Sequence, residues 1–157
     1  MHPAKLSPFW AQMKDTFEEI LVSEAVHREI LAGRGLSRTD VPVLISAMEE
    51  GWIKVRKDAR SSRKLPNYLG EGEKQTILLM KKEKTEWLFI DDRIAREVAI
   101  SLGLEPRYSV YLLPFWVNKD RITKSTALDW LDGLVETGYY LKAQHFLAVR
   151  DLINSLP

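Results

Sequence analysis

The chain of 157 residues is long enough for one domain with a substantial buried core, and its net charge of +1 leaves it nearly neutral. It contains no cysteine, which excludes disulfides, thiolate metal sites and a cysteine nucleophile, and its three histidines show no ligand spacing, so any bound metal should be held by oxygen. No apolar stretch approaches the roughly 20 residues that cross a bilayer, and no signal-peptide pattern begins the chain, so we expect a cytoplasmic protein without a membrane partner.

The first part of the chain alternates predicted helices with predicted strands. The spacing of apolar residues predicts a helix over residues 6–17, a buried strand over 20–22, two further helices, and a strand over 52–56. Ser23 is the expected N-cap of the first of these two helices, and either Thr39 or Asp40 caps the second. Gly33 and Gly51 are expected where the two helices end.

The second part of the chain begins with a polar, basic loop over residues 57–69. It continues with a helix over about 72–84, a strand over 87–90, a helix over 93–102, and a mostly helical remainder after Val110. Strands that alternate with helices over this length predict an α/β fold with a parallel sheet, in one domain of residues 1–157.

Four carboxylates are candidates for a metal site. The apolar run before Asp91 and Asp92 ends abruptly in these two acids, and the carboxyl ends of strands are where ligands bind in open α/β sheets. Glu29 and Glu73, each on a predicted helix, could meet them in such a fold. Carboxylates about 4 Å apart repel by about 4 kcal/mol per pair at an effective dielectric near 20, so a cluster of this kind implies a cation, Mg or Mn.

Each of these acids also has a plainer interpretation, which the sequence leaves open. Glu29 could be a solvated helix acid. Glu71 and Glu73 could complement the positive N-terminus of their helix. Asp91 could cap the following helix, a role that needs only one of the two neighbouring aspartates.

A basic stretch runs from Lys54, within the predicted strand over residues 52–56, to Lys64 in the loop that follows. It is the candidate nucleic-acid-binding surface. A local basic arm can contact phosphates although the chain as a whole is nearly neutral. The candidate contacts are Arg56, Lys57, Arg60, Arg63 and Lys64, with Asp58 as the single acid among them. The plainer interpretation is a solvated surface. The five tryptophans are expected in the core rather than on a base-stacking platform.

Three ordered segments resemble the PIN-domain superfamily. They are residues 22–30, the segment Leu69-Gly70-Glu71-Gly72-Glu73, and residues 89–96 with Ile90-Asp91-Asp92. The last two are similar to the LGxGE and IDDxxAR motifs of a prokaryotic PIN-like branch of predicted nucleic-acid-binding proteins, and the likeness runs from about Ala4 to Ile153. The resemblance implies a three-layer α/β/α domain with a short, mostly parallel sheet flanked by helices and a helical C-terminal part.

The resemblance also implies an activity. PIN proteins are typically Mg- or Mn-dependent ribonucleases, and many are toxins with an antitoxin protein as partner. By position, Glu29, Glu73 and Asp92 would be the catalytic acids, and Asp91 would occupy the adjacent polar position. Together they would hold one or two metals that activate water against an RNA phosphodiester.

The likeness begins after the family's first strand, so the aspartate that ends that strand has no counterpart here. A missing strand would expose a sheet edge that a homodimer could cover. Bulky residues at 108–111 also replace a glycine-rich segment of the branch. Three hypotheses follow: a metal-dependent ribonuclease, a catalytically weakened module that binds nucleic acid or protein, and an α/β interaction protein whose acids are caps and surface groups.

Overall fold

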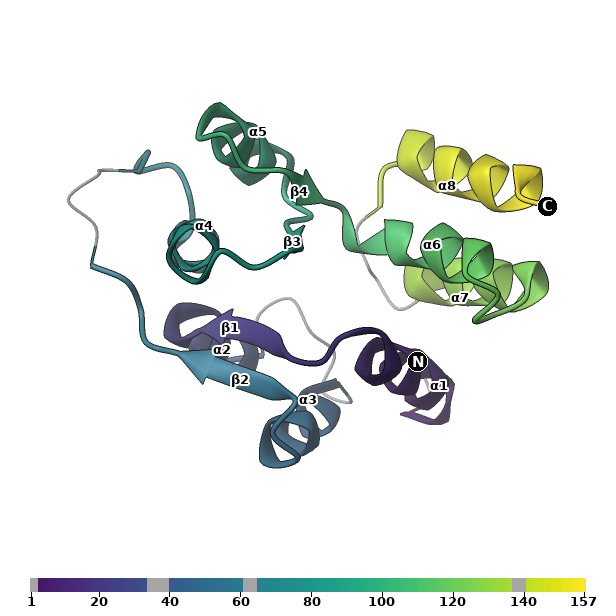
Figure 1. Ribbon diagram of the computed structural model, residues 1–157, viewed down its shortest axis with the longest axis horizontal. Helices are drawn as coiled ribbons and strands as arrows, with labels where there is room; N and C mark the ends of the chain where they lie inside the picture. The colour runs from purple at the N-terminus through teal and green to yellow at the C-terminus, as the bar shows by residue number, and fades with distance from the viewer. Residues whose placement is uncertain (1–2, 34–39, 61–64, 137–140) are drawn as a thin grey trace. The chain divides into compact units, whose positions relative to one another are not determined.

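The computed structural model describes residues 3–33, 40–60, 65–136 and 141–157. The fold consists of two compact units, one formed by Lys14–Arg107 and the other by Met1–Met13 together with Tyr108–Pro157. Figure 1 shows the order of the helices and strands along the chain. All four predicted metal-binding acids belong to the unit Lys14–Arg107.

A parallel pair of strands organises the first part of Lys14–Arg107. Strand β1 (Ile20–Ser23) lies beside β2 (Ile53–Arg56), and their register pairs Ile20 with Ile53 and Ser23 with Arg56. Helices α2 (Glu24–Leu31) and α3 (Asp40–Glu49) connect the two strands. Helix α4 (Glu71–Glu83) contacts both β1 and α2. The carboxyl ends of β1 and β2 therefore lie together, next to the start of α2.

A second parallel pair follows in the same unit. Strand β3 (Leu88–Phe89) pairs with β4 (Pro106–Arg107), and helix α5 (Arg93–Ser101) connects them. The Arg96 guanidinium donates to the carbonyls of Ile90 and Pro106, at 3.4 and 2.8 Å, and so joins the two strands to the helix. The apolar core of this part consists of Leu69, Ile77, Leu88, Ile90, Ala95 and Ala99.

The predicted start of α2 and the predicted ends of α2 and α3 are confirmed, whereas the helix predicted over residues 6–17 spans Pro3–Thr16. Ser23 Oγ accepts a hydrogen bond from the Val26 amide at 3.2 Å, as an N-cap does. Gly33 and Gly51 adopt φ values of +70° and +82° just after α2 and α3, a conformation that glycine takes without a steric penalty. Thr39, one of the two alternatives for the third helix, lies outside the described residues, and α3 begins at Asp40.

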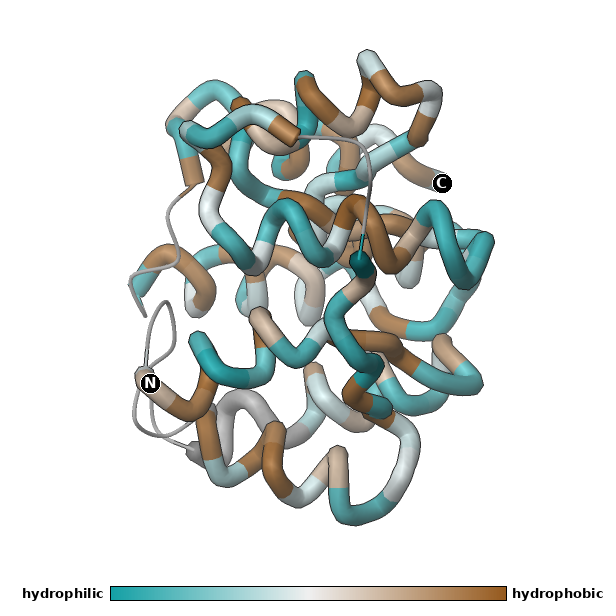
Figure 2. Tube along the Cα trace, turned by 90° about the vertical axis from the view of Figure 1, so that its left-hand side faces the viewer, coloured by the Kyte–Doolittle hydropathy of each residue, from teal (hydrophilic) through white to brown (hydrophobic). Residues whose placement is uncertain are grey.

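The second unit is helical. Helix α1 (Pro3–Thr16) contributes its first residues, and the 3₁₀ turn η1 (Ser109–Tyr111) leads into α6 (Leu112–Asn118), α7 (Lys124–Glu136) and α8 (Ala143–Ser155). Figure 2 colours the Cα trace by hydropathy and shows apolar and polar residues mixed along the chain. The buried side chains of this unit include Val110, Leu112, Leu113, Trp116, Leu131, Val149 and Ile153.

Aromatic side chains form the centre of this helical unit. The Phe9 ring packs edge-to-face against Trp116 and Trp130, with ring centroids 5.3 and 5.8 Å apart. Trp116 is fully buried, and Trp52 is buried in the other unit. The other three tryptophans are half-buried, so the expectation that tryptophans serve the core is met most clearly at Trp52 and Trp116.

The α/β class with short parallel strands and a helical C-terminal part is confirmed. The difference from the predicted single sheet is that the strands within the described ranges form two separate two-stranded pairs. That the two units make up one domain stays a prediction. Among the residues that the structure describes, no helix has both the length and the apolar character of a membrane span.

Candidate functional site

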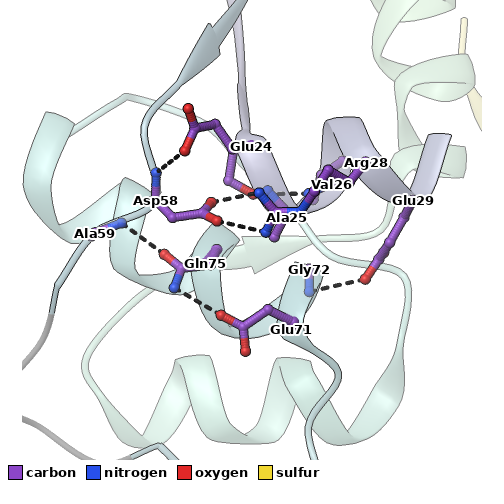
Figure 3. A network of polar contacts seen from close by, with 11 residues as sticks. Glu24, Ala25, Val26, Arg28, Glu29, Asp58, Ala59, Glu71, Gly72 and Gln75 are labelled. Atoms are coloured by element: carbon purple, nitrogen blue, oxygen red, sulfur yellow. Dashed lines mark hydrogen bonds and ion pairs between the residues drawn. The ribbon is translucent and has the colours of Figure 1, made fainter. Parts of the chain in front are cut away.

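The side chain of Glu29, a residue of α2, lies against the N-terminus of α4. Its Oε1 accepts a hydrogen bond from the Gly72 amide at 3.2 Å, as Figure 3 shows. Amide groups in the first turn of a helix have no acceptor within the helix and carry a partial positive charge, so a carboxylate is stabilised there. Glu29 reaches this place from α2, which packs against α4. The carboxylate of Glu29, which was predicted as a metal ligand, is therefore held by the start of α4 and does not simply extend into solvent.

Two glycines leave room for two carboxylates in this turn. A Cβ atom at Gly72 would lie 2.6 Å from Glu29 Oε2, closer than real Cβ contacts come. A Cβ atom at Gly70 would overlap the carboxylate of Glu73, which folds back over the start of α4. Glycine at positions 70 and 72 thus has a steric reason, because a side chain at either position would collide with a carboxylate. Both carboxylates, of Glu29 and Glu73, lie at the same helix terminus.

The two aspartates after β3 have different roles. Asp92 is the N-cap of α5, and its Oδ1 accepts from the Ala95 amide at 2.8 Å. Asp91 is exposed at the carboxyl end of β3. The plainer interpretation that the sequence left open for Asp91 therefore applies to Asp92, the acid that the resemblance makes catalytic.

The structure brings together only part of the predicted metal site. Glu29 and Glu73 share the first turn of α4, whereas Asp91 and Asp92 follow β3. In the described ranges, no three acidic or histidine side chains gather as ligands of one metal would. The four-acid metal site thus stays a prediction, with the glutamate pair as its best-defined half.

Asp92 offers a test that separates its charge from its capping role. Asp92→Ala is expected to lower the free energy of unfolding by about 1 kcal/mol, because the Ala95 amide loses its acceptor. Asp92→Asn keeps an oxygen acceptor and should change stability by only a few tenths of a kcal/mol, about the spread among good capping residues. Urea denaturation followed by circular dichroism measures both, with Asp129→Ala on the exposed face of α7 as the control. Equal losses in the alanine and asparagine variants would contradict the capping role.

Asp58 is a site residue that the sequence analysis did not propose. Its Oδ1 accepts from the Ala25 amide at 2.9 Å, and its Oδ2 pairs with Arg28 Nη2 at 2.8 Å. The Asp58 amide donates to Glu24 Oε2 at 3.3 Å. Asp58 therefore binds the first two turns of α2, the helix that carries Glu29.

Gln75 continues these contacts into α4. Its Oε1 accepts from the Ala59 amide at 2.8 Å, and its Nε2 donates to Glu71 Oε1 at 3.0 Å. The Gln75 side chain is buried, and both ends of its amide group are hydrogen-bonded, as a buried polar group requires. Figure 3 shows Asp58 and Ala59 in the segment that follows β2, with Gln75 on α4 beside them.

A signal for Asp58 was present in the sequence. Asp58 comes two residues after β2, so the rule that directed attention to Asp91 at the end of β3 applies equally to it. In the sequence it stands out only as the single acid of a basic stretch, and its contacts with α2 depend on the parallel pairing of β1 and β2.

The basic stretch is described in part. Arg56 is half-buried at the end of β2, and Lys57 and Arg60 are exposed. Arg63 and Lys64 lie outside the described residues.

Lys54, also in this stretch, forms an ion pair with Glu19, whose carboxylate lies 2.6 Å from its Nζ. The hydrogen bond from Lys54 lowers the pKa of Glu19 below its ordinary value. Part of the basic charge is therefore neutralised locally. Lys57 and Arg60 are further exposed cations among the described residues of this stretch.

The chain was compared with known families, curated proteins and solved structures. The model of a family described as a PIN domain matches residues 10–155, nearly the whole chain. No curated protein and no solved structure matches the chain significantly. PIN domains are of nuclease type, associated with nucleic acids and generally dependent on divalent metals. The chain belongs to the PIN-domain superfamily.

Proposed function

We propose that this chain is a metal-dependent ribonuclease that cuts RNA phosphodiesters, and that Glu29 and Glu73 hold its Mg or Mn. The observation that carries the proposal is the first turn of α4, where Gly70 and Gly72 leave room for these two carboxylates. Membership in the PIN-domain superfamily supports the nuclease type.

The residues present fit a metal of this kind. Mg is usually held by one or two carboxylates, with waters and substrate phosphates completing its shell, so the pair Glu29 and Glu73 offers enough protein ligands of the right chemistry. Asp91, exposed after β3, is the further acid that we assign to the site, beside the cap Asp92. A metal bound there would lower the pKa of a bound water and stabilise charge that develops on the phosphodiester.

The protein itself orients the ligands and attracts the substrate. The Gly72 amide fixes one oxygen of Glu29, so this carboxylate does not have to be ordered when a ligand arrives. Lys57 and Arg60 supply exposed positive charge for the RNA backbone, together with Arg56, Arg63 and Lys64 of the same stretch. A toxin role with an antitoxin partner, and a homodimer, remain predictions.

Calorimetric titration of Mn tests the proposal directly. The wild-type chain is expected to bind Mn, and the double variant Glu29→Gln/Glu73→Gln is expected to bind it at least about tenfold more weakly, because it loses both carboxylates. Glu97→Gln serves as the control, since Glu97 pairs with Arg93 on the exposed side of α5. RNA cleavage assayed on the same proteins should follow Mn affinity. Equal Mn affinity in the wild type and the double variant would overturn the proposal.

A second candidate function is a weakened module that binds RNA without cutting it. The observation in its favour is that no three potential ligands gather within the described part of the chain. This candidate predicts RNA binding that weakens steeply with salt and yields no products. If the wild type forms RNA cleavage products and Glu73→Gln does not, this candidate is excluded. The same result excludes an interaction protein whose acids are only caps and surface groups.

A further inference from the structure

The segment that follows β2 is hydrogen-bonded to two helices, α2 and α4. We call Asp58 and Ala59 the strap. On one side the Asp58 carboxylate binds the Ala25 amide at 2.9 Å and Arg28 at 2.8 Å, both on α2. On the other side the Ala59 amide donates to Gln75 on α4 at 2.8 Å. Two consecutive residues thus contact α2 and α4 through separate hydrogen bonds (Figure 3).

The hydrogen bonds of the strap and the hydrogen bond between Glu29 and Gly72 connect the same two helices, α2 and α4. Arg28 and Glu29 are neighbours in α2; Asp58 holds the first, and the Gly72 amide of α4 binds the second. Gln75 lies one turn after Gly72 and is held by Ala59 and Glu71. The helix that carries Glu29 and the helix that carries Glu73 are therefore linked twice, once by the strap and once by the Glu29 carboxylate itself.

The side chains at the two ends of these contacts, Asp58 and Gln75, are largely shielded from solvent. The Asp58 side chain is only 23% exposed, and Gln75 is 8% exposed. Removal of either side chain leaves a partner amide without its acceptor, in surroundings where water replaces it poorly. With the strap broken, the packing of α2 on α4 and the Glu29 hydrogen bond to Gly72 would remain to hold Glu29 at the start of α4.

We propose that Asp58 and Gln75 are positioning residues, which hold α2 and α4 so that Glu29 and Glu73 meet at the first turn of α4. This inference rests on the proposed function in so far as those glutamates bind a metal. Groups that orient metal ligands typically change metal affinity by 10- to 100-fold when they are replaced.

The Gly72 amide reports on the strap without any metal. Gly72 lies in the first turn of α4, ahead of the first backbone bond within the helix, from Lys74 to Gly70, so its exchange protection depends on Glu29. In Asp58→Ala and Gln75→Leu, hydrogen exchange measured by NMR should be at least about tenfold faster at Gly72 than in the wild type, after correction for global stability.

Ser23→Ala is the matched control. Ser23 caps the same end of α2 through the Val26 amide, and the described hydrogen bonds of Asp58 and Ala59 go to other residues. The substitution should weaken the cap of α2 and leave the corrected exchange rate at Gly72 within about twofold of the wild type. The inference is overturned if Gly72 responds equally to Ser23→Ala and Asp58→Ala, or if it responds to neither strap variant.

Mn titration of the same proteins separates the two proposals. Asp58→Ala and Gln75→Leu should each weaken Mn binding by about 10-fold or more, and Ser23→Ala should not. Asp58→Asn keeps an acceptor for the Ala25 amide but loses the Arg28 pair, so its affinity should fall between those of the wild type and Asp58→Ala. If the wild type binds Mn and the strap variants bind it equally well, the positioning role is overturned. If the wild type binds no Mn, the proposed function fails, and the Gly72 measurement still decides whether the strap positions Glu29.

Discussion

Replacement of Trp116 by alanine is expected to lower the free energy of unfolding by about 3 to 5 kcal/mol. Trp116 is completely buried, and its ring packs edge-to-face against Phe9 and Trp130, with ring centroids 5.3 and 6.1 Å apart. The truncation removes the largest buried side chain of the helical unit and leaves a cavity that its neighbours can fill only partly. Urea denaturation followed by circular dichroism measures the loss.

Two further variants show whether this loss comes from packing. Trp116→Phe keeps an aromatic ring in the same place and should cost less than the alanine change. Leu147→Ala, on the exposed side of α8, should change the free energy of unfolding by less than about 0.5 kcal/mol. A loss below about 1 kcal/mol for Trp116→Ala would mean that the helical unit can repack around the missing ring.

Gly72→Ala is expected to affect activity and stability differently. A Cβ atom at this position would lie 2.6 Å from Glu29 Oε2, so the carboxylate must move away. A ligand displaced by about 1 Å can cost about 100-fold in rate, and we expect metal-dependent RNA cleavage to fall by that amount. The fold should persist, because the displaced atom is the end of a flexible side chain and alanine favours the helix by up to about 1 kcal/mol.

Gly133→Ala is the control for this substitution. Gly133 lies in α7, and a Cβ atom there would meet nothing within 4 Å. The variant should gain the same helix preference and leave cleavage unchanged. Comparison of the two cleavage rates at saturating Mn, beside their urea denaturation curves, measures the effect. Full activity in Gly72→Ala would show that the placement of Glu29 against α4 is not needed for the reaction.

Local patterns predicted the helices and strands well, because their causes are local. Ser23 caps α2 and Gly51 follows α3 for reasons contained in a few neighbouring residues. Strand β4 was not predicted, since Pro106 and Arg107 are too short a segment to show a period. The division of the strands into two pairs was also missed, because pairing is decided by contacts between distant segments.

The candidate site could be predicted only in part for a similar reason. The resemblance indicated Glu29 and Glu73. That Glu29 reaches the first turn of α4, and that Gly70 and Gly72 leave room there for both carboxylates, is visible only in three dimensions. Either aspartate after β3 could have been the cap, and only the geometry assigns that role to Asp92. Asp58 was missed because its contacts join residues 30 and 33 positions apart in the sequence.

The division of the chain into units has a consequence for its synthesis. Residues Lys14–Arg107 are continuous, whereas the helical unit combines the start of α1 with everything after Arg107. A ribosome releases the chain from the N-terminus at about 5–20 residues per second, so the continuous unit can fold while the last helices are still being made. The apolar side of α1 must wait for Trp116 and Trp130 to emerge. During that interval the Phe9 ring lacks its native contacts with the Trp116 and Trp130 rings.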